Sequence, residues 1–130
     1  SAARVGAAAA RFEAHGFSVA DIRRPPFAAC FDGVLVSKVL HHMDDQGARA
    51  ALAALLAVLR PGGRMLILEP LPTTWRTGPV PHVLARLETG QHRRNTDGLA
   101  ELLPAGSALE PLDNIHKAAA RFGIWLVRGT

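Results

Sequence analysis

The chain has 130 residues, a formal net charge of +4 and a hydrophobic fraction of 48%. This length fits one domain, and a half-hydrophobic composition excludes a wholly disordered chain. No apolar run approaches the roughly 20 residues that a membrane-spanning helix needs. The single cysteine, Cys30, excludes an internal disulfide and a cysteine-rich zinc site, and it fits a cytoplasmic location.

The basic residues do not indicate a nucleic-acid partner, although the sequence pI is about 10.6. Most of them are arginines scattered among alanines and glycines. The only clusters are the pairs Arg23–Arg24 and Arg93–Arg94, and neither is interleaved with the aromatic residues that stack on bases. We therefore expect no nucleic-acid partner.

The first half of the chain alternates between helical and extended patterns. A helical stripe covers residues 2–15 and would end at Gly16, and the apolar run 17–20 predicts a strand. Residues 31–36 predict a second strand, apolar on both faces as in a buried parallel strand. This alternation predicts an α/β domain.

A long helix follows, and Asp44 or Asp45 would cap it. Pro61-Gly62-Gly63 would end this helix and lead into a third strand at 65–68. Strands separated by helices predict crossover connections and a parallel sheet.

The second half of the chain differs in pattern. Prolines mark a loop from Pro70 onward, a short helix is expected at 83–90, and another would run to Leu103 from a cap at Asn95, Thr96 or Asp97. Two late strands, at 109–115 and 124–127, are joined too closely for a crossover helix, so we expect an antiparallel hairpin. The domain then divides into a core over 1–69, a substrate lid or cap over 70–104 and a hairpin over 105–130.

Two segments carry a resemblance to a known family. Residues 31–45 read FDGVLVSKVLHHMDD, and residues 59–70 read LRPGGRMLILEP. The "FD" that opens a strand, the "HH" before an acidic helix cap and the "L-x-P-G-G" turn closely resemble class I S-adenosylmethionine-dependent methyltransferases. Asp21-Ile22 also stands where the family has an acidic–aliphatic pair after its third strand. The resemblance implies a Rossmann-like, mostly parallel sheet with strand order 3-2-1-4-5-7-6 and an antiparallel C-terminal hairpin.

Two sequence motifs of the family do not occur in these residues. They are the glycine-rich "D-x-G-x-G-x-G" loop after the first strand and the acidic residue that grips the ribose after the second. Residues 4–7 do not replace the loop, because they lie in a helical pattern with one glycine. The chain begins at Ser1, without an initiator methionine or a secretory signal pattern. We therefore expect a domain truncated at its N-terminus, a fragment that binds cofactor weakly by itself.

The resemblance implies S-adenosylmethionine as the cofactor and assigns its contacts. Asp21 and Ile22 are expected at the adenine, and Ser37 and Lys38 at the methionine portion. For Asp21 the alternative is a solvated turn residue, and Lys38 has the same alternative as a solvated neighbour of Ser37.

The paired histidines His41 and His42 are the candidate catalytic residues. Methyl transfer from a sulfonium is an in-line displacement, and a neutral imidazole at its site can remove a proton from the acceptor. The alternative is a structural role, in which one ring packs under the start of the helix. Two adjacent histidines without suitably spaced carboxylates do not predict a metal site.

The candidate substrate contacts are Glu69, Trp75, Arg86 and His92. Glu69 either orients the substrate or only ends its strand, and the other three lie in the region expected to form the lid. The expected acceptor is a small molecule, with no membrane partner. Without the family's first two strands, the strand at 31–36 would expose one edge, and we expect self-association through it.

Two other functions stay open at this point. One is a catalytically inactive methyltransferase fragment that serves as an interaction module. The other is half of a nicotinamide dehydrogenase, which the absence of a glycine fingerprint with a following acid disfavours.

Overall fold

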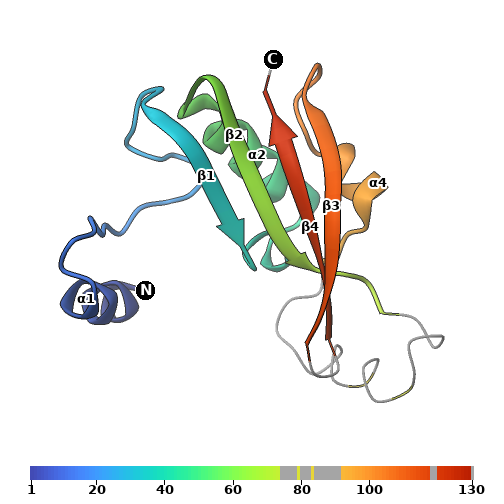
Figure 1. The fold of residues 1–130 in the computed structure, drawn as a ribbon, viewed down its shortest axis with the longest axis horizontal. Coiled ribbons are helices and arrows are strands. Elements are labelled where there is room, and N and C mark those ends of the chain that lie inside the picture. Colours follow the sequence, from blue (N-terminus) through green and yellow to red (C-terminus); the bar gives the residue numbers. More distant parts are fainter. Residues whose placement is uncertain (74–78, 80–82, 84–91, 118–119, 130) are drawn as a thin grey trace.

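The computed structural model describes residues 1–73, 79, 83, 92–117 and 120–129. In chain order its elements are α1 (Ala2–Arg11), β1 (Phe31–Ser37), the 3-10 turn η1 (Leu40–His42), α2 (Asp45–Ala57), β2 (Leu59–Pro70), α4 (Thr96–Ala100), β3 (Ala108–Lys117) and β4 (Ala120–Arg128). The strands form one sheet in the order β1-β2-β4-β3, and α2 and α4 cover one of its faces (Figure 1).

The central position of β2 gives it a neighbour on each side. β1 runs parallel to it, with Val34 opposite Met65, whereas β4 runs antiparallel to it and pairs with β3 in the same sense. The α/β class, the parallel pairing of the strands expected at 31–36 and 65–68, and the C-terminal hairpin are confirmed. The order also matches the 4-5-7-6 end of the family's sheet.

The predicted cap of α2 forms, but the predicted end is wrong: α2 ends at Ala57, and Pro61-Gly62-Gly63 lies inside β2, at an irregularity between Leu59 and Arg64. Asp44 is the N-cap of α2, and its carboxylate accepts a hydrogen bond from the Gly47 amide at 2.7 Å. After the helix, Gly62 turns the chain at a φ of 81°. A Cβ on Gly63 would stand 2.9 Å from the Arg60 carbonyl oxygen. The turn therefore requires glycine at both positions, for two different reasons.

The first helix is shorter than the one expected over residues 2–15. α1 ends at Arg11, and Phe12 leaves the helical region with a φ of −128° and a ψ of 69°. None of its residues is buried, and Figure 1 shows it beside β1, far from α2. Because short helices depend on packing for most of their stability, nothing extends α1 to Gly16, and that predicted end is wrong.

The strand expected at 17–20 does not form. These residues have no strand pairing, and Phe17 and Val19 are exposed. A strand needs a partner for its backbone amides and carbonyls. In the family's sheet, strands 1 and 2 separate this position from the strand that corresponds to β1, and those two strands carry the motifs that this sequence does not contain. The prediction was wrong, because no described strand pairs with these residues.

Later elements form where they are expected, except that α4 ends at Ala100 and does not reach Leu103. Asn95 is the N-cap of α4, and its side chain accepts a hydrogen bond from the Gly98 amide at 2.9 Å. The strands expected at 109–115 and 124–127 are parts of the longer β3 and β4. The helix expected at 83–90 lies outside the described residues, apart from its first.

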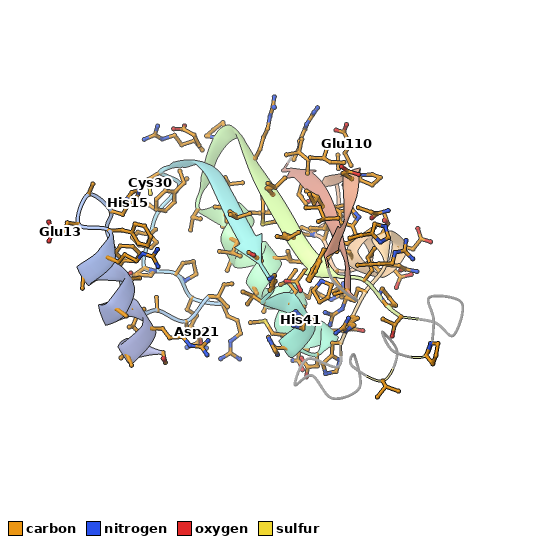
Figure 2. The ribbon with its side chains drawn as sticks, turned by 60° about the horizontal axis from the view of Figure 1, so that its bottom comes forward. Glu13, His15, Asp21, Cys30, His41 and Glu110 are labelled. Carbon is orange, nitrogen blue, oxygen red and sulfur yellow. The ribbon has the colours of Figure 1, made fainter. Side chains whose placement is uncertain are left out.

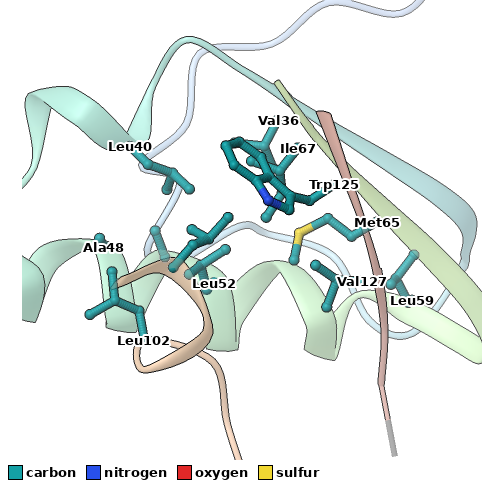
Figure 3. Close-up of a cluster of buried hydrophobic side chains, with 12 residues drawn as sticks. Val36, Leu40, Ala48, Leu52, Leu59, Met65, Ile67, Leu102, Trp125 and Val127 are labelled. Atoms are coloured by element: carbon teal, nitrogen blue, oxygen red, sulfur yellow. The ribbon is translucent and has the colours of Figure 1, made fainter. Parts of the chain in front are cut away.

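A hydrophobic core fills the space between the sheet and the two helices (Figure 3). Its buried members are Val36, Leu40, Ala48, Ala51, Leu52, Leu59, Met65, Ile67, Leu99, Leu102, Trp125 and Val127. Trp125 is the largest, and its indole Nε1 donates to Thr96 Oγ1 at 2.9 Å. This hydrogen bond ties the strand β4 to the first residue of α4.

The other face of the sheet carries no helix in the described part of the chain. Leu35, Leu66 and Leu126 lie in register across β1, β2 and β4 on this face. Leu35 is 66% exposed, whereas its neighbour Val36, on the core face, is buried. β1 thus combines an uncovered apolar face with an outer edge to which no described strand pairs.

Gly123 should be irreplaceable because the Trp125 ring lies over it. An added Cβ would stand 2.2 Å from the nearest ring carbon. We expect Gly123→Ala to displace the indole and lower the free energy of unfolding by about 1–3 kcal/mol, the usual cost of overpacking. Denaturant unfolding followed by circular dichroism measures this. Gly129→Ala is the control, because nothing lies within 4 Å of its Cβ position, and equal losses in both variants would contradict the prediction.

Candidate active site

The carboxyl ends of β1 and β2 meet at one edge because these strands run parallel, with Ser37 opposite Leu68. From Ser37 the chain passes through η1 and enters α2 at Asp45. Ligands of open parallel sheets bind at the edge where the strands end. The turn of residues 38–44, which we call the β1–α2 turn, is therefore the centre of the candidate site.

Glu69, near the end of β2, anchors the β1–α2 turn by accepting hydrogen bonds from its backbone amides. One carboxylate oxygen accepts from the amides of Val39 at 2.6 Å and Leu40 at 2.8 Å, and the other accepts from the His41 amide at 3.3 Å. The Glu69 side chain is only 7% exposed. A buried anion needs several donors, and η1 supplies its three unpaired amides. The geometry assigns Glu69 to the turn, and a contact with substrate stays a prediction.

The same carboxylate also fixes the first histidine. His41 Nδ1 lies 2.6 Å from Glu69 Oε2, and the imidazole is 9% exposed. A carboxylate that already accepts three amide hydrogens acts as an acceptor, so the proton of neutral His41 lies on Nδ1. Nε2 then carries the lone pair, and no described residue forms a hydrogen bond with it.

His42, the second histidine, is exposed to solvent, and its ring lies against that of His41. The two ring centres lie 4.0 Å apart, at an interplanar angle of 38°. The expected alternative, one ring packed under the start of the helix, describes His41, although its ring is bonded to a carboxylate. The structure thus separates the pair into one buried, oriented imidazole and one accessible imidazole.

His92 is the candidate substrate contact that the structure brings to this site. Its amide donates to the His41 carbonyl at 3.0 Å. Both residues line a cavity of about 10 Å³, which is the room for about one water molecule. Trp75 and Arg86, the other candidates from the lid, lie outside the described residues.

Arg94 is a site residue that the sequence did not reveal. Its side chain is 11% exposed, and its guanidinium donates to the carbonyls of Leu40 at 2.9 Å and Met43 at 2.8 Å. It also forms an ion pair with Asp45 at 2.8 Å. The pattern showed only a basic pair at 93–94, and no signal tells that Arg94 reaches the β1–α2 turn while Arg93 donates to the Leu71 carbonyl.

Lys38 shows backbone strain at the end of β1. It has a φ of 55°, a left-handed conformation that favours glycine, and its amide donates to the Leu68 carbonyl at 2.8 Å. The side chain is exposed, with Nζ 5.1 Å from the centre of the Phe122 ring. Strain of this kind concentrates at functional sites. Ser37, also exposed, is placed beside it at the same rim.

Asp21 lies on a separate segment at the side of the sheet where α1 is found (Figure 2). Ile22 is half-buried against the core. Asp21 is exposed, and Arg23 donates to its two carboxylate oxygens at 3.0 and 2.8 Å. The bonded Arg23 lowers the pKa of Asp21 from the ordinary 3.8 to about 2. Asp21 therefore stays ionised at any physiological pH.

A cleft of about 620 Å³ joins Asp21 to the start of α2. Its lining residues are Asp21, Arg23, Arg24, Asp44, Gln46, Gly47 and Ala50. Because α2 starts directly after the β1–α2 turn, the cleft lies at the carboxyl edge of the sheet. Ser37 and Lys38 do not line it. The structure thus places Asp21 at this cleft, Ile22 against the core, and Ser37 and Lys38 at the end of β1.

No group of three or more His, Cys, Asp or Glu side chains that could hold a metal ion occurs among the described residues. In the same part of the chain, every helix is too short or too polar to cross a membrane.

Comparison with known proteins gives the class of this fold and site. Residues 1–63 match the family model described as a methyltransferase domain. A curated relative, acetylserotonin O-methyltransferase from Gallus gallus, is 36% identical over 83 residues, which are 61% of this chain and 24% of the relative.

Solved structures of similar fold extend over the whole chain. A Pyrococcus horikoshii protein matches 100% of this chain and 68% of its own at a TM-score of 0.70 and 13% identity. The Burkholderia thailandensis 1,6-didemethyltoxoflavin-N1-methyltransferase, solved with bound S-adenosylhomocysteine, matches 96% of this chain and 56% of its own at a TM-score of 0.63 and 22% identity.

These findings confirm the resemblance read from the sequence. Residues 1–63 are similar in sequence to the methyltransferase domain, and the fold is similar to that of a solved methyltransferase. The chain spans about a quarter of the length of the curated relative.

The Glu69 carboxylate should be worth far more to stability than an exposed one. In Glu69→Gln an amide group replaces one acceptor oxygen and faces donors, so we expect the free energy of unfolding to fall by about 3 kcal/mol. Hydrogen exchange should also speed up at the amides of residues 39–41. Glu110→Gln is the control, because its exposed ion pair with Arg128 is worth at most about 1 kcal/mol. Equal denaturation midpoints for the two variants would refute this role of Glu69.

Proposed function

We propose that the protein containing this chain transfers a methyl group from S-adenosylmethionine to a small molecule. The match of residues 1–63 to the methyltransferase domain carries this proposal, because that stretch includes Asp21, Ser37 and both histidines. A neighbour of the same fold, solved with bound S-adenosylhomocysteine, supports the cofactor. We place the protein in the cytoplasm, as its single cysteine suggests.

The residues present fit one end of this cofactor. The cleft beside Asp21 falls in the usual size range of small-molecule sites and offers an ionised carboxylate, an acceptor suited to an exocyclic amine. We assign Asp21 and the Ile22 amide to the adenine, and Ser37 and Lys38 to the methionine portion. When bound, S-adenosylmethionine supplies an electrophilic methyl group, and the chain's own residues position the acceptor.

We assign the proton transfer to His41. Glu69 fixes the hydrogen on Nδ1, which leaves the Nε2 lone pair to take the proton that the acceptor loses as its bond to the methyl carbon forms. The carboxylate also stabilises the imidazolium that results. His42, accessible and stacked on His41, is the second candidate for this role. Glu69 acts here as a positioning residue, and His92 lies close enough to contact the acceptor.

We further propose that the chain associates with a second copy through the outer edge of β1. This edge has unpaired backbone groups among the described residues, and Leu35 is exposed on the uncovered face next to it. Edges of this kind pair with other chains unless a charge or a bulge protects them. The proposal therefore treats β1 as an assembly edge in the isolated chain.

The cofactor assignment can be tested by titration calorimetry with S-adenosylmethionine on the full-length gene product. We expect binding, and Asp21→Ala should weaken it by about 1 kcal/mol, which is about fivefold, through loss of one hydrogen bond. Asp32→Ala is the control, because Asp32 is an exposed carboxylate that pairs with an arginine at the other end of β1. Tritiated cofactor with a small-molecule cell extract then tests transfer, which His41→Gln should abolish. Failure of the full-length product to bind would overturn the proposal. The 130-residue chain alone should bind more weakly.

Sedimentation velocity tests the assembly edge. We expect the 130-residue chain to associate with rising concentration, and Leu35→Lys to make it monomeric. Leu112→Lys on the outer strand β3 is the control, since Leu112 is 50% exposed, and it should leave association unchanged. A wild-type monomer at all concentrations would contradict the proposal.

A further inference from the structure

After the residues that we expect to form the lid, the chain returns to the site at His92. Leu71 leaves the end of β2 with its amide bonded to the Arg121 carbonyl at 2.9 Å, and His92 re-enters with its amide bonded to the His41 carbonyl at 3.0 Å. The chain is therefore hydrogen-bonded to β4 at Leu71, and again at His92 to the residue that we assign as the base.

Arg94 fastens this returning end. Its Nη1 donates to the carbonyl of Leu40 at 2.9 Å and to that of His92 at 3.0 Å, so one atom links the two segments. Its Nη2 donates to the Met43 carbonyl at 2.8 Å, and Nε and Nη2 both reach Asp45 Oδ1, at 3.1 and 2.8 Å. All three guanidinium nitrogens are thus bonded to this part of the structure.

The β1–α2 turn is consequently held from two sides by opposite charges. Glu69 accepts hydrogen bonds from the amides of residues 39–41, and Arg94 donates hydrogen bonds to the carbonyls of Leu40 and Met43. Both side chains are largely buried, and each comes from outside the turn. Arginine suits this role because its planar fork can bond several acceptors in fixed directions, which the point charge of lysine cannot reproduce.

We propose that Arg94 is a positioning residue that holds His92 against the turn that carries His41 and so sets the place of the acceptor. This inference rests on the proposed methyl transfer. Among the described residues, Arg94 bonds to none of the proposed cofactor contacts, whereas it links His92 to Leu40, the neighbour of His41. Loss of Arg94 should therefore affect the acceptor more than the cofactor.

The test compares Arg94→Gln and Arg94→Lys with Arg49→Gln. The control is matched, because Arg49 also donates to a carbonyl, that of Glu101 at 2.9 Å, and ties α2 to the end of α4 instead of the turn. Hydrogen exchange of the 130-residue chain is read at the amides of residues 40–43 and His92. We expect exchange there to rise about tenfold or more in Arg94→Gln, and less in Arg94→Lys. Unchanged exchange in both variants would overturn the proposal.

Kinetics of the full-length gene product complete the test. We expect the KM for the acceptor to rise about tenfold in Arg94→Gln while the KM for S-adenosylmethionine stays within about twofold, with partial rescue in Arg94→Lys. An equal rise in both constants would overturn the positioning role. If the wild type transfers no methyl group, the proposed function fails, and the exchange data still decide whether Arg94 fastens the segment. Should Arg94→Gln fail to fold, Arg94→Lys carries the same comparison.

Discussion

A single buried carboxylate organises the edge of this sheet at which the active site is proposed. Glu69 loses its hydration on the core side of β2, and such an anion is tolerated only where several donors replace water. The donors come from the turn after β1, because three consecutive amides of a 3-10 turn point the same way. To present these amides, the chain must reverse immediately after the strand. Lys38 makes this reversal by adopting a strained left-handed backbone conformation.

The same carboxylate links structure to the proposed chemistry. It holds the turn and the His41 ring together, so the orientation of the imidazole is fixed wherever the turn is formed. Arg94 adds a second constraint on the carbonyl side, and the Trp125 hydrogen bond to Thr96 steadies the residues just beyond it. The site is rigid at its base although only short turns and strand ends build it.

Local patterns predicted the elements whose signals lie within themselves. The cap at Asp44, the strand β1 and the hairpin formed as expected, whereas Pro61-Gly62-Gly63 lies within β2 instead of ending the helix. The strand at 17–20 did not form, because an extended pattern cannot supply its own partner. The roles of Glu69 and Arg94 depend on contacts across 28 to 54 residues, and no periodicity records such contacts. The sequence indicated Glu69 as a residue at the strand end and the paired histidines as the candidate bases, but it did not indicate which histidine is buried.

The two anchors of the lid region bear on how it can vary. Because Leu71 and His92 are each hydrogen-bonded to the body of the domain, the stretch between them starts and finishes at fixed points. Loops with fixed ends accept changes of length and composition at a small cost in closure entropy, since that cost grows only slowly with loop length. Changes in the intervening residues should therefore leave the hydrogen bonds at Leu71 and His92, and with them the sheet, the capped turn and the oriented imidazole, in place.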